Sequence, residues 1–261
     1  MKENLSKTKA LLLDLDGTVY LDGALIGDVK NTLQYFREKG ITLVYLTNNS
    51  SRTDKEYIER LKNIGIYDQN DIVYTSLDSA IDYINDNYKG KTVYPVAMDS
   101  VIEELEQKGI KVVSDNADIV LLAFDRKLDY EKIVKANEHM VKGAIYIATH
   151  PDNTCPAPGV FIPDLGSIMQ MFKCSSGRDA DIITGKPYKI LADYIMKRLN
   201  LNPEQVTMVG DRLNTDIAFG VNSGINSVLV LTGDTDLQTA KSSPIKADIT
   251  LDNIDMLKQY I

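Results

Sequence analysis

Short runs of apolar residues alternate along this chain with segments of helical periodicity, and this alternation restricts the fold more than any other feature. Runs of this length and composition are typical of buried strands. Strands that alternate with helices predict an α/β fold built on a parallel sheet with helices on both faces. The predicted strands are residues 10–13, 41–46, 72–74, 92–97, 119–124, 144–148, 206–209 and 227–231.

Helical periodicity, capping residues and closing glycines give the expected helices between these runs. Proline and glycine predict an irregular loop over residues 150–166. His139 falls on a polar helix face, where we expect a solvated side chain. The main predicted helices are residues 53–65, 101–109, 130–140, 167–172, 188–199 and 215–224, with a terminal helix after residue 252.

The 261 residues are enough for two hydrophobic cores. The net charge of −8 and the lack of a basic stripe argue against nucleic-acid binding, although a metal ion and one lysine can still attract a small anion. No apolar run approaches the roughly 18 residues of a membrane span, and the N-terminus lacks a signal-peptide pattern, so we expect no membrane association and a cytoplasmic protein. Cys155 and Cys174 are predicted to be reduced thiols.

Polar residues follow three of the predicted strands. Asp14 and Asp16 end the first, Thr47 and Asn48 end the second, and Asp211 ends the strand from residue 206. Ligands of open parallel sheets bind beyond the carboxyl ends of the strands. These side chains are therefore expected to converge on one site.

The first of these motifs, Asp14-Leu15-Asp16-Gly17-Thr18, has the chemistry of a magnesium site. Two carboxylates two positions apart repel each other unless a cation or a proton lies between them. Mg²⁺ prefers such oxygen ligands together with a substrate phosphate. Gly17 allows a tight turn that brings backbone N–H groups toward an anion. Two solvated turn aspartates are the alternative interpretation.

Two further motifs suit a phosphate. The hydroxyl of Thr47 and the amide of Asn48 can bind phosphoryl oxygens, with helix capping as the alternative role. Lys186 opens a helix in Gly-Lys-Pro, where ammonium and helix N-terminus both favour an anion; a solvated surface lysine is the alternative.

Asp211 can complete a metal site, and Asp216 either orients Lys186 or acts as an N-terminal helix acid.

The ordered set of DLDGT at 14–18, TN at 47–48, GK at 185–186 and GDRLNTD at 210–216 resembles the four motifs of the haloacid dehalogenase (HAD) superfamily. The surrounding sequence is similar to subfamily IIA, the NagD-like or p-nitrophenyl phosphatase-like proteins. LTNNSSRT, HPDNTCPAPG, ITGKP and VLVLTG carry this closer likeness. The resemblance extends over nearly the whole chain.

The resemblance implies a role for each matching residue. Asp14 matches the nucleophile and a metal ligand, and Asp16 matches the general acid–base, which binds metal through its backbone carbonyl. Thr47 and Lys186 match phosphate-binding groups, with Asn48 nearby. The implied cofactor is Mg²⁺.

Two further acids complete this set by the same resemblance. Asp211 matches the metal ligand of the fourth motif and Asp216 a supporting acid, as Gly17 supports the first motif. Asp14 would attack phosphorus while Asp16 protonates the leaving oxygen and later activates water.

The family also implies a Rossmann-like core of residues 1–78 and 180–261 with an inserted α/β cap of the C2 type at 79–179. The substrate would be a small phosphorylated metabolite, and such caps often support a homodimer. The cap residues His150, Asp152, Asn153 and Thr154 would approach the leaving group, although a structural role for His150 is equally open. The chain departs from the family pattern at 179–184 and at Asn214.

Three other classes of protein compete with a phosphatase. A phospho-receiver domain also combines an acidic cluster with Thr and Lys, but it is shorter and has no large insertion. A phosphotransferase or phosphomutase on the same scaffold would pass the phosphoryl group to a second substrate. A nucleotide-binding module without chemistry is the third, and the lack of a GxGxxG after Leu13 counts against a dinucleotide site.

Overall fold

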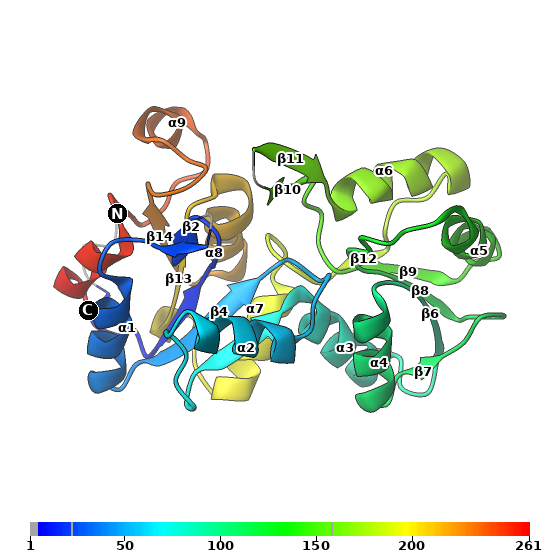
Figure 1. The fold of residues 1–261 in the computed structure, drawn as a ribbon, viewed down its shortest axis with the longest axis horizontal. Helices are drawn as coiled ribbons and strands as arrows, with labels where there is room; N and C mark the ends of the chain where they lie inside the picture. The colour runs from blue at the N-terminus through cyan, green and yellow to red at the C-terminus, as the bar shows by residue number, and fades with distance from the viewer. Residues whose placement is uncertain (1–4, 22, 158) are drawn as a thin grey trace. The chain divides into compact units, whose positions relative to one another are not determined.

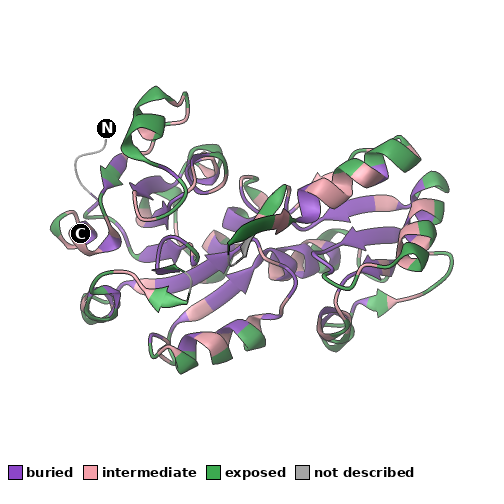
Figure 2. Cartoon of the chain, turned by 45° about the horizontal axis from the view of Figure 1, so that its top comes forward, coloured by how far each residue is buried: buried purple, intermediate pink, exposed green. Residues whose placement is uncertain are grey.

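The computed structural model describes residues 5–21, 23–157 and 159–261 and divides the chain into two compact units. The first comprises residues 1–47, 55–74 and 186–261, and the second comprises residues 48–54 and 75–185. Each has its own parallel sheet, whose strands are largely buried (Figure 2). The chain passes between the units at 47–48, 54–55, 74–75 and 185–186.

The first unit is a six-stranded sheet in the order β15-β14-β13-β1-β4-β5, and every pairing that is described in it is parallel (Figure 1). Strand β1 lies between β13 and β4, with Leu13 opposite Val209 and Tyr45. The strands are β1 Ala10–Leu13, β4 Thr42–Thr47, β5 Ile72–Thr75, β13 Val206–Gly210, β14 Asn226–Val230 and β15 Ile249–Leu251.

Alternate residues of these strands face opposite layers, because side chains alternate along a strand. Leu11 and Leu13 of β1 pack in the layer with α1 Val29–Glu38, α2 Asp54–Asn63 and the 3₁₀ helix Ile254–Gln259. Leu12 packs in the layer with α7 Ile190–Leu199 and α8 Ala218–Ser223. The first unit therefore has helices on both faces of its sheet. A small hairpin of β2 Tyr20–Leu21 and β3 Ala24–Leu25 follows β1, and α9 Leu237–Ser242 precedes β15.

The second unit has a five-stranded parallel sheet in the order β12-β9-β8-β6-β7. Helices α3 and α4 pack against one face and α5 and α6 against the other. The strands are β6 Thr92–Val96, β7 Lys111–Val112, β8 Ile119–Leu122, β9 Ile145–Ala148 and β12 Ile182–Ile183, and the helices are α3 Ser76–Asn87, α4 Asp99–Gln107, α5 Tyr130–Val141 and α6 Leu165–Ser176.

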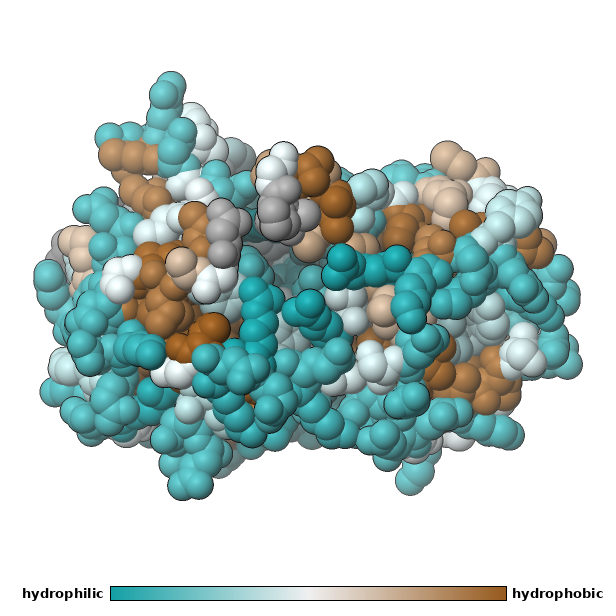
Figure 3. Space-filling view, viewed as in Figure 1, coloured by the Kyte–Doolittle hydropathy of each residue, from teal (hydrophilic) through white to brown (hydrophobic). Residues whose placement is uncertain are grey.

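The predicted α/β class is confirmed, whereas several details of the prediction were wrong. Residues 150–166 are not an irregular loop, because Thr154–Ala157 and Val160–Pro163 form the antiparallel hairpin β10–β11. Val160 and Phe161 of this hairpin are 57% and 62% exposed, and Figure 3 shows hydrophobic side chains at its surface. A prediction from apolar runs missed the hairpin because most side chains of β11 are exposed.

His139 is the second correction. Its ring is buried, packs against Tyr94 with ring centroids 5.1 Å apart, and places Nε2 3.1 Å from the Ser114 carbonyl. The helical position alone did not show that another element covers this face. No helix of the described chain is long and apolar enough to cross a bilayer.

Helix α3 was also missed, although the sequence contains its start signal. Thr75 is the N-cap, and Asp78 closes a reciprocal capping box. The Asp78 carboxylate accepts hydrogen bonds from the backbone N–H and the hydroxyl of Thr75 at 2.8 and 2.7 Å. Burial raises the pKa of Asp78 to about 6, against the opposing effect of the Thr75 hydrogen bonds.

We expect Asp78→Asn to change the pH dependence of stability. A folded-state pKa above the unfolded value means that ionising Asp78 lowers the free energy of unfolding, and this cost appears between pH values of about 4 and about 6. The stability of the variant relative to wild type should therefore rise across this interval, as measured by urea unfolding followed by circular dichroism.

Asp118→Asn is the control of opposite sign. Hydrogen bonds from the Thr92 backbone, from Lys91 and from the Thr92 hydroxyl lower the pKa of Asp118 to about 2. This variant should lose stability relative to wild type as pH rises between about 2 and about 4. Equal pH profiles for Asp78→Asn and wild type would contradict the assigned burial effect.

Candidate active site

Three acidic side chains and one lysine converge at the carboxyl ends of the central strands of the first unit. Asp14 follows β1, Asp211 follows β13, and Asp216 lies one turn further along. One carboxylate oxygen from each lies within 4.8 Å of the others. This convergence follows from the parallel register, because Leu13 pairs with Val209 and the next residues of both strands leave the sheet at the same edge.

The Lys186 ammonium joins two of these acids. Its Nζ lies 2.6 Å from Oδ1 of Asp14 and 2.7 Å from Oδ1 of Asp216. The Lys186 and Asp216 side chains are 2% and 1% exposed, and the Asp14 side chain is 15% exposed. The alternative of a solvated surface lysine is therefore wrong, since Lys186 is buried between two carboxylates.

The charges in this cluster alter one another's ionisation. Burial raises the pKa of Asp14 well above its ordinary value; Lys186 opposes this rise, whereas Asp216 and Asp211 add to it. Burial lowers the pKa of Lys186, but Asp14 and Asp216 outweigh it and the pKa is raised. Burial and then Asp216 raise the pKa of Asp211 to about 6, although a backbone hydrogen bond from Asp234 opposes the rise.

The donor set fits a divalent cation. When ionised, three carboxylates and one ammonium have a net charge of −3 + 1 = −2. Close carboxylates of this kind need a counter-charge or a shared proton. Mg²⁺ takes oxygen ligands and keeps positions for a substrate phosphate. Asp14 and Asp211 were expected as metal ligands, whereas Asp216 enters the cluster as a third acid that also contacts Lys186.

Asp216 owes its position to an irregular turn. Residues Leu213–Ile217 form a π-helical turn before α8, in which the N–H groups of Asp216 and Ile217 both reach the Arg212 carbonyl. The Arg212 backbone N–H donates to Oδ2 of Asp216 at 3.1 Å. π turns are rare and are frequent at functional sites. Here the turn directs Asp216 back toward Lys186.

Asp16 is not one of the three clustered carboxylates. Its side chain is exposed, and the Tyr20 hydroxyl donates to Oδ2 at 3.5 Å. Burial and then Asp16 raise the pKa of Tyr20, so this phenol stays a donor. Gly17 turns the chain here with φ +91°, and its N–H donates to the Tyr20 carbonyl at 2.8 Å.

Sequence reasoning did not assign a role to the loop after β14, although it quoted its Thr-Gly. The Asp234 N–H donates to Oδ2 of Asp211 at 2.7 Å, and the Thr232 hydroxyl donates to the Gly17 carbonyl at 2.5 Å. Gly233 permits this approach, since a Cβ there would overlap with Oδ2 of Asp211. This loop fixes the direction of the Asp211 carboxylate.

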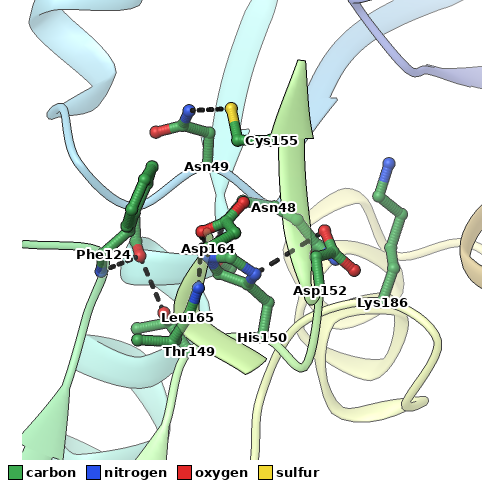
Figure 4. Close-up of polar contacts among 12 residues, drawn as sticks. Asn48, Asn49, Phe124, Thr149, His150, Asp152, Cys155, Asp164, Leu165 and Lys186 are labelled. Carbon is green, nitrogen blue, oxygen red and sulfur yellow. Dashed lines mark hydrogen bonds and ion pairs between the residues drawn. The ribbon is translucent and has the colours of Figure 1, made fainter. Parts of the chain in front are cut away.

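The remaining predicted residues divide between the units. Thr47 ends β4, buried, in the first unit, whereas Asn48 belongs to the second. There, Nδ2 of Asn48 donates to Oδ2 of Asp152 at 3.1 Å, and His150 lies beside Asp152 (Figure 4). Asn153 and Thr154 are exposed at the start of the β10–β11 hairpin.

Family profiles and known proteins match this chain over most of its length. Profiles described as haloacid dehalogenase-like hydrolase and HAD-hydrolase-like match residues 11–111 and 183–257. An acid sugar phosphatase of Staphylococcus aureus is 32% identical over 242 residues, covering 92% of this chain and 93% of the relative.

Two solved structures extend the comparison. A 4-nitrophenylphosphatase from Thermotoga maritima superposes with a TM-score of 0.94 at 36% identity, covering 98% of both chains. A glycerol phosphate phosphatase from Mycobacterium tuberculosis, solved in complex with calcium, superposes with a TM-score of 0.89 at 26% identity. That alignment covers 97% of this chain and 75% of the other.

We expect Gly233→Ala to weaken binding of Mg²⁺ by about 10–100-fold, because the added methyl group displaces the Asp211 carboxylate from its backbone donor. Isothermal titration calorimetry of metal-free protein with MgCl₂ measures this directly. Gly40→Ala is the matched control, since Gly40 has φ +74° but no atom within 4 Å of its Cβ position. Equal Mg²⁺ affinity in both variants would contradict the role of the loop.

Proposed function

The chain belongs to the haloacid dehalogenase-like hydrolases, and from this premise we propose a Mg²⁺-dependent phosphatase of small phosphate monoesters that works through an aspartyl-phosphate on Asp14. That the chain is a phosphatase of this family follows from its relatives of nearly equal length. The contacts of Lys186 with Asp14 and Asp216, beside Asp211, are the observation that supports the finer proposal.

Asp14 is proposed as the nucleophile. Its carboxylate oxygen would attack phosphorus while the bond from phosphorus to the ester oxygen breaks, so that the phosphoryl group transfers to Asp14. The Lys186 ammonium, 2.6 Å from Asp14, opposes the effect of burial on the pKa of this carboxylate and is proposed to stabilise the phosphoryl oxygens.

Asp16 is proposed as the general acid and then the general base. Its exposed carboxyl group, two residues beyond the nucleophile, would give a proton to the leaving oxygen. It would next take a proton from the water that attacks phosphorus, which releases inorganic phosphate and restores Asp14. The Tyr20 hydroxyl beside Asp16 limits where this carboxyl group points.

Asp14, Asp211 and the backbone carbonyl of Asp16 are proposed to hold the Mg²⁺ ion, with Asp216 as the supporting acid that orients Lys186. When bound, the ion supplies Lewis-acid polarisation of the phosphoryl oxygens and neutralises excess carboxylate charge. Thr47 and Asn48 are proposed as further hydrogen-bond donors to the phosphoryl oxygens.

The proposed substrate class is small monoesters, with sugar phosphates first. The name of the Staphylococcus aureus relative, an acid sugar phosphatase, supports sugar phosphates, and the 4-nitrophenylphosphatase of Thermotoga maritima supports small monoesters in general. The second unit, by analogy with an α/β cap, is proposed to select the alcohol part of the substrate through the segment from His150 to Thr154.

We expect a panel of phosphorylated sugars, nucleotides and 4-nitrophenyl phosphate to give phosphate release that depends on added Mg²⁺ and is abolished by EDTA. Excess MgCl₂ after EDTA should restore the rate. Full activity in metal-free buffer would contradict the metal requirement, and transfer of phosphate to a second metabolite instead of water would favour the phosphotransferase alternative.

We expect Asp14→Asn to abolish turnover because the amide is not a nucleophile, and Asp16→Asn to lower kcat by about 10²–10⁴, the range of general acid–base catalysis. The decrease in kcat caused by Asp16→Asn should be smaller for esters with good leaving groups, such as 4-nitrophenyl phosphate, because these leaving groups need little protonation. Mass spectrometry must exclude deamidation of the introduced asparagine back to aspartate.

Exposed Asp179, paired with Lys173 at 2.9 Å, offers the matched control. Asp179→Asn should keep the wild-type rate. Full activity of the Asp14→Asn protein would refute the assigned nucleophile.

A further inference from the structure

A histidine and two aspartates form a buried cluster at the base of the β10–β11 hairpin, here called the His150 cluster and consisting of His150, Asp152 and Asp164 (Figure 4). The His150 side chain is 0% exposed. Its Nδ1 lies 3.6 Å from Oδ2 of Asp152, and its Nε2 lies 3.7 Å from Oδ1 of Asp164. His150 was expected to approach the leaving group, but its complete burial points to an indirect role.

The two aspartates mark the two ends of the hairpin. Asp152 precedes β10, and Asp164 follows β11 and caps α6 by accepting from the Leu165 N–H at 2.7 Å. The backbone also closes this base, since the Asp164 N–H donates to the Asn153 carbonyl at 2.9 Å and the Gly166 N–H to the Asp152 carbonyl at 2.7 Å. His150 adds the side-chain connection between the two ends.

The same contacts extend to Asn48. Oδ2 of Asp152 faces Nδ1 of His150 and also accepts from Nδ2 of Asn48 at 3.1 Å. The Asn48 carbonyl accepts from the Ser76 hydroxyl at 2.5 Å, which holds the backbone of this residue. The direction of the Asn48 amide group therefore depends on Asp152, and the position of Asp152 depends on His150.

The chemistry of the cluster favours a protonated ring. Carboxylates only accept, so both ring nitrogens must carry hydrogen for both contacts to be favourable. Within the described chain neither ring nitrogen has a hydrogen-bond partner, and the two carboxylates lie at ion-pair distances of 3.6 and 3.7 Å. A buried polar atom without a partner is costly, so opposite charges are needed on both sides. A metal ion would be coordinated by one ring nitrogen together with both carboxylates, whereas here each carboxylate faces a different nitrogen.

We propose that His150 is a positioning residue: as an imidazolium between Asp152 and Asp164 it closes the base of the β10–β11 hairpin and orients Asp152 toward Asn48. The hairpin and the Asn48 amide are thereby presented to the substrate in one fixed arrangement. The effect on substrate binding rests on the proposed phosphatase function, whereas the charged bridge itself does not.

The charged bridge of His150 between Asp152 and Asp164 can be tested independently of enzyme activity, by nitrogen NMR of histidine-labelled protein at pH 7. The chain has two histidines, and His139→Gln assigns the signals. We expect both nitrogens of His150 to carry hydrogen, also after treatment with a chelator, and Asp164→Asn to return the ring to a neutral tautomer. A neutral ring in the wild-type protein, or a signal that changes when the chelator removes a metal, overturns the proposal.

Kinetics test the consequence. We expect His150→Gln and Asp164→Asn each to raise KM for a sugar phosphate about tenfold while kcat changes by less than about threefold, the pattern of lost substrate binding. The double variant should be no worse than either single variant, because both remove the same bridge. Asp179→Asn in the same unit is the control and should match wild type.

The NMR and kinetic measurements test the positioning role of His150 separately from the proposed phosphatase function. If kcat and KM stay unchanged in Asp164→Asn while the NMR signal of His150 changes, the positioning role is refuted. If the wild-type protein hydrolyses no phosphate ester, the proposed function fails, yet the NMR result still decides whether the bridge exists. Should His150→Gln not fold, Asp164→Asn alone decides both measurements.

Discussion

The buried ammonium of Lys186 between Asp14 and Asp216 is the interaction on which the candidate active site depends. Removing charges from water costs several kcal/mol per ion even after relaxation, and only short, well-directed contacts offset that cost. The three residues come from separate segments: the end of β1, the start of the last segment of the first unit, and the turn after β13. The attraction therefore fixes the segment that begins at Lys186 against the ends of two neighbouring strands.

The surrounding backbone is built to tolerate this concentration of charge. Three carboxylates outnumber one ammonium, and burial alone pushes the pKa of both Asp14 and Asp211 upward. Glycines 17 and 233 leave room for the Asp211 carboxylate, and the Asp234 N–H stabilises its charged form. Close carboxylates of this kind need a counter-charge, and this need is the physical basis of the proposed divalent-cation site.

The second unit contains a similar arrangement, in which a nitrogen-bearing side chain lies between two carboxylates. The ring of His150 lies between two acids as the ammonium of Lys186 does, and both side chains are almost completely buried. The units are joined through residues that the proposed chemistry also uses, because Thr47 and Asn48, like Gly185 and Lys186, are neighbours in sequence but belong to different units. Within the second unit the Cβ position of Gly185 would lie 2.7 Å from Oδ1 of Asn48, so these two connections run side by side.

Sequence alone determined the α/β class and the segments that meet at the site, since buried strands, helical periods and the polar residues at strand ends are local patterns. It could not determine which acid faces Lys186, because the π turn that directs Asp216 depends on packing against β13 and β14. The β10–β11 hairpin and the burial of His139 and His150 were equally beyond it. A pattern along one segment shows which residues prefer burial, whereas the partners of a polar side chain are set by elements far away in the chain, and only the tertiary structure decides them.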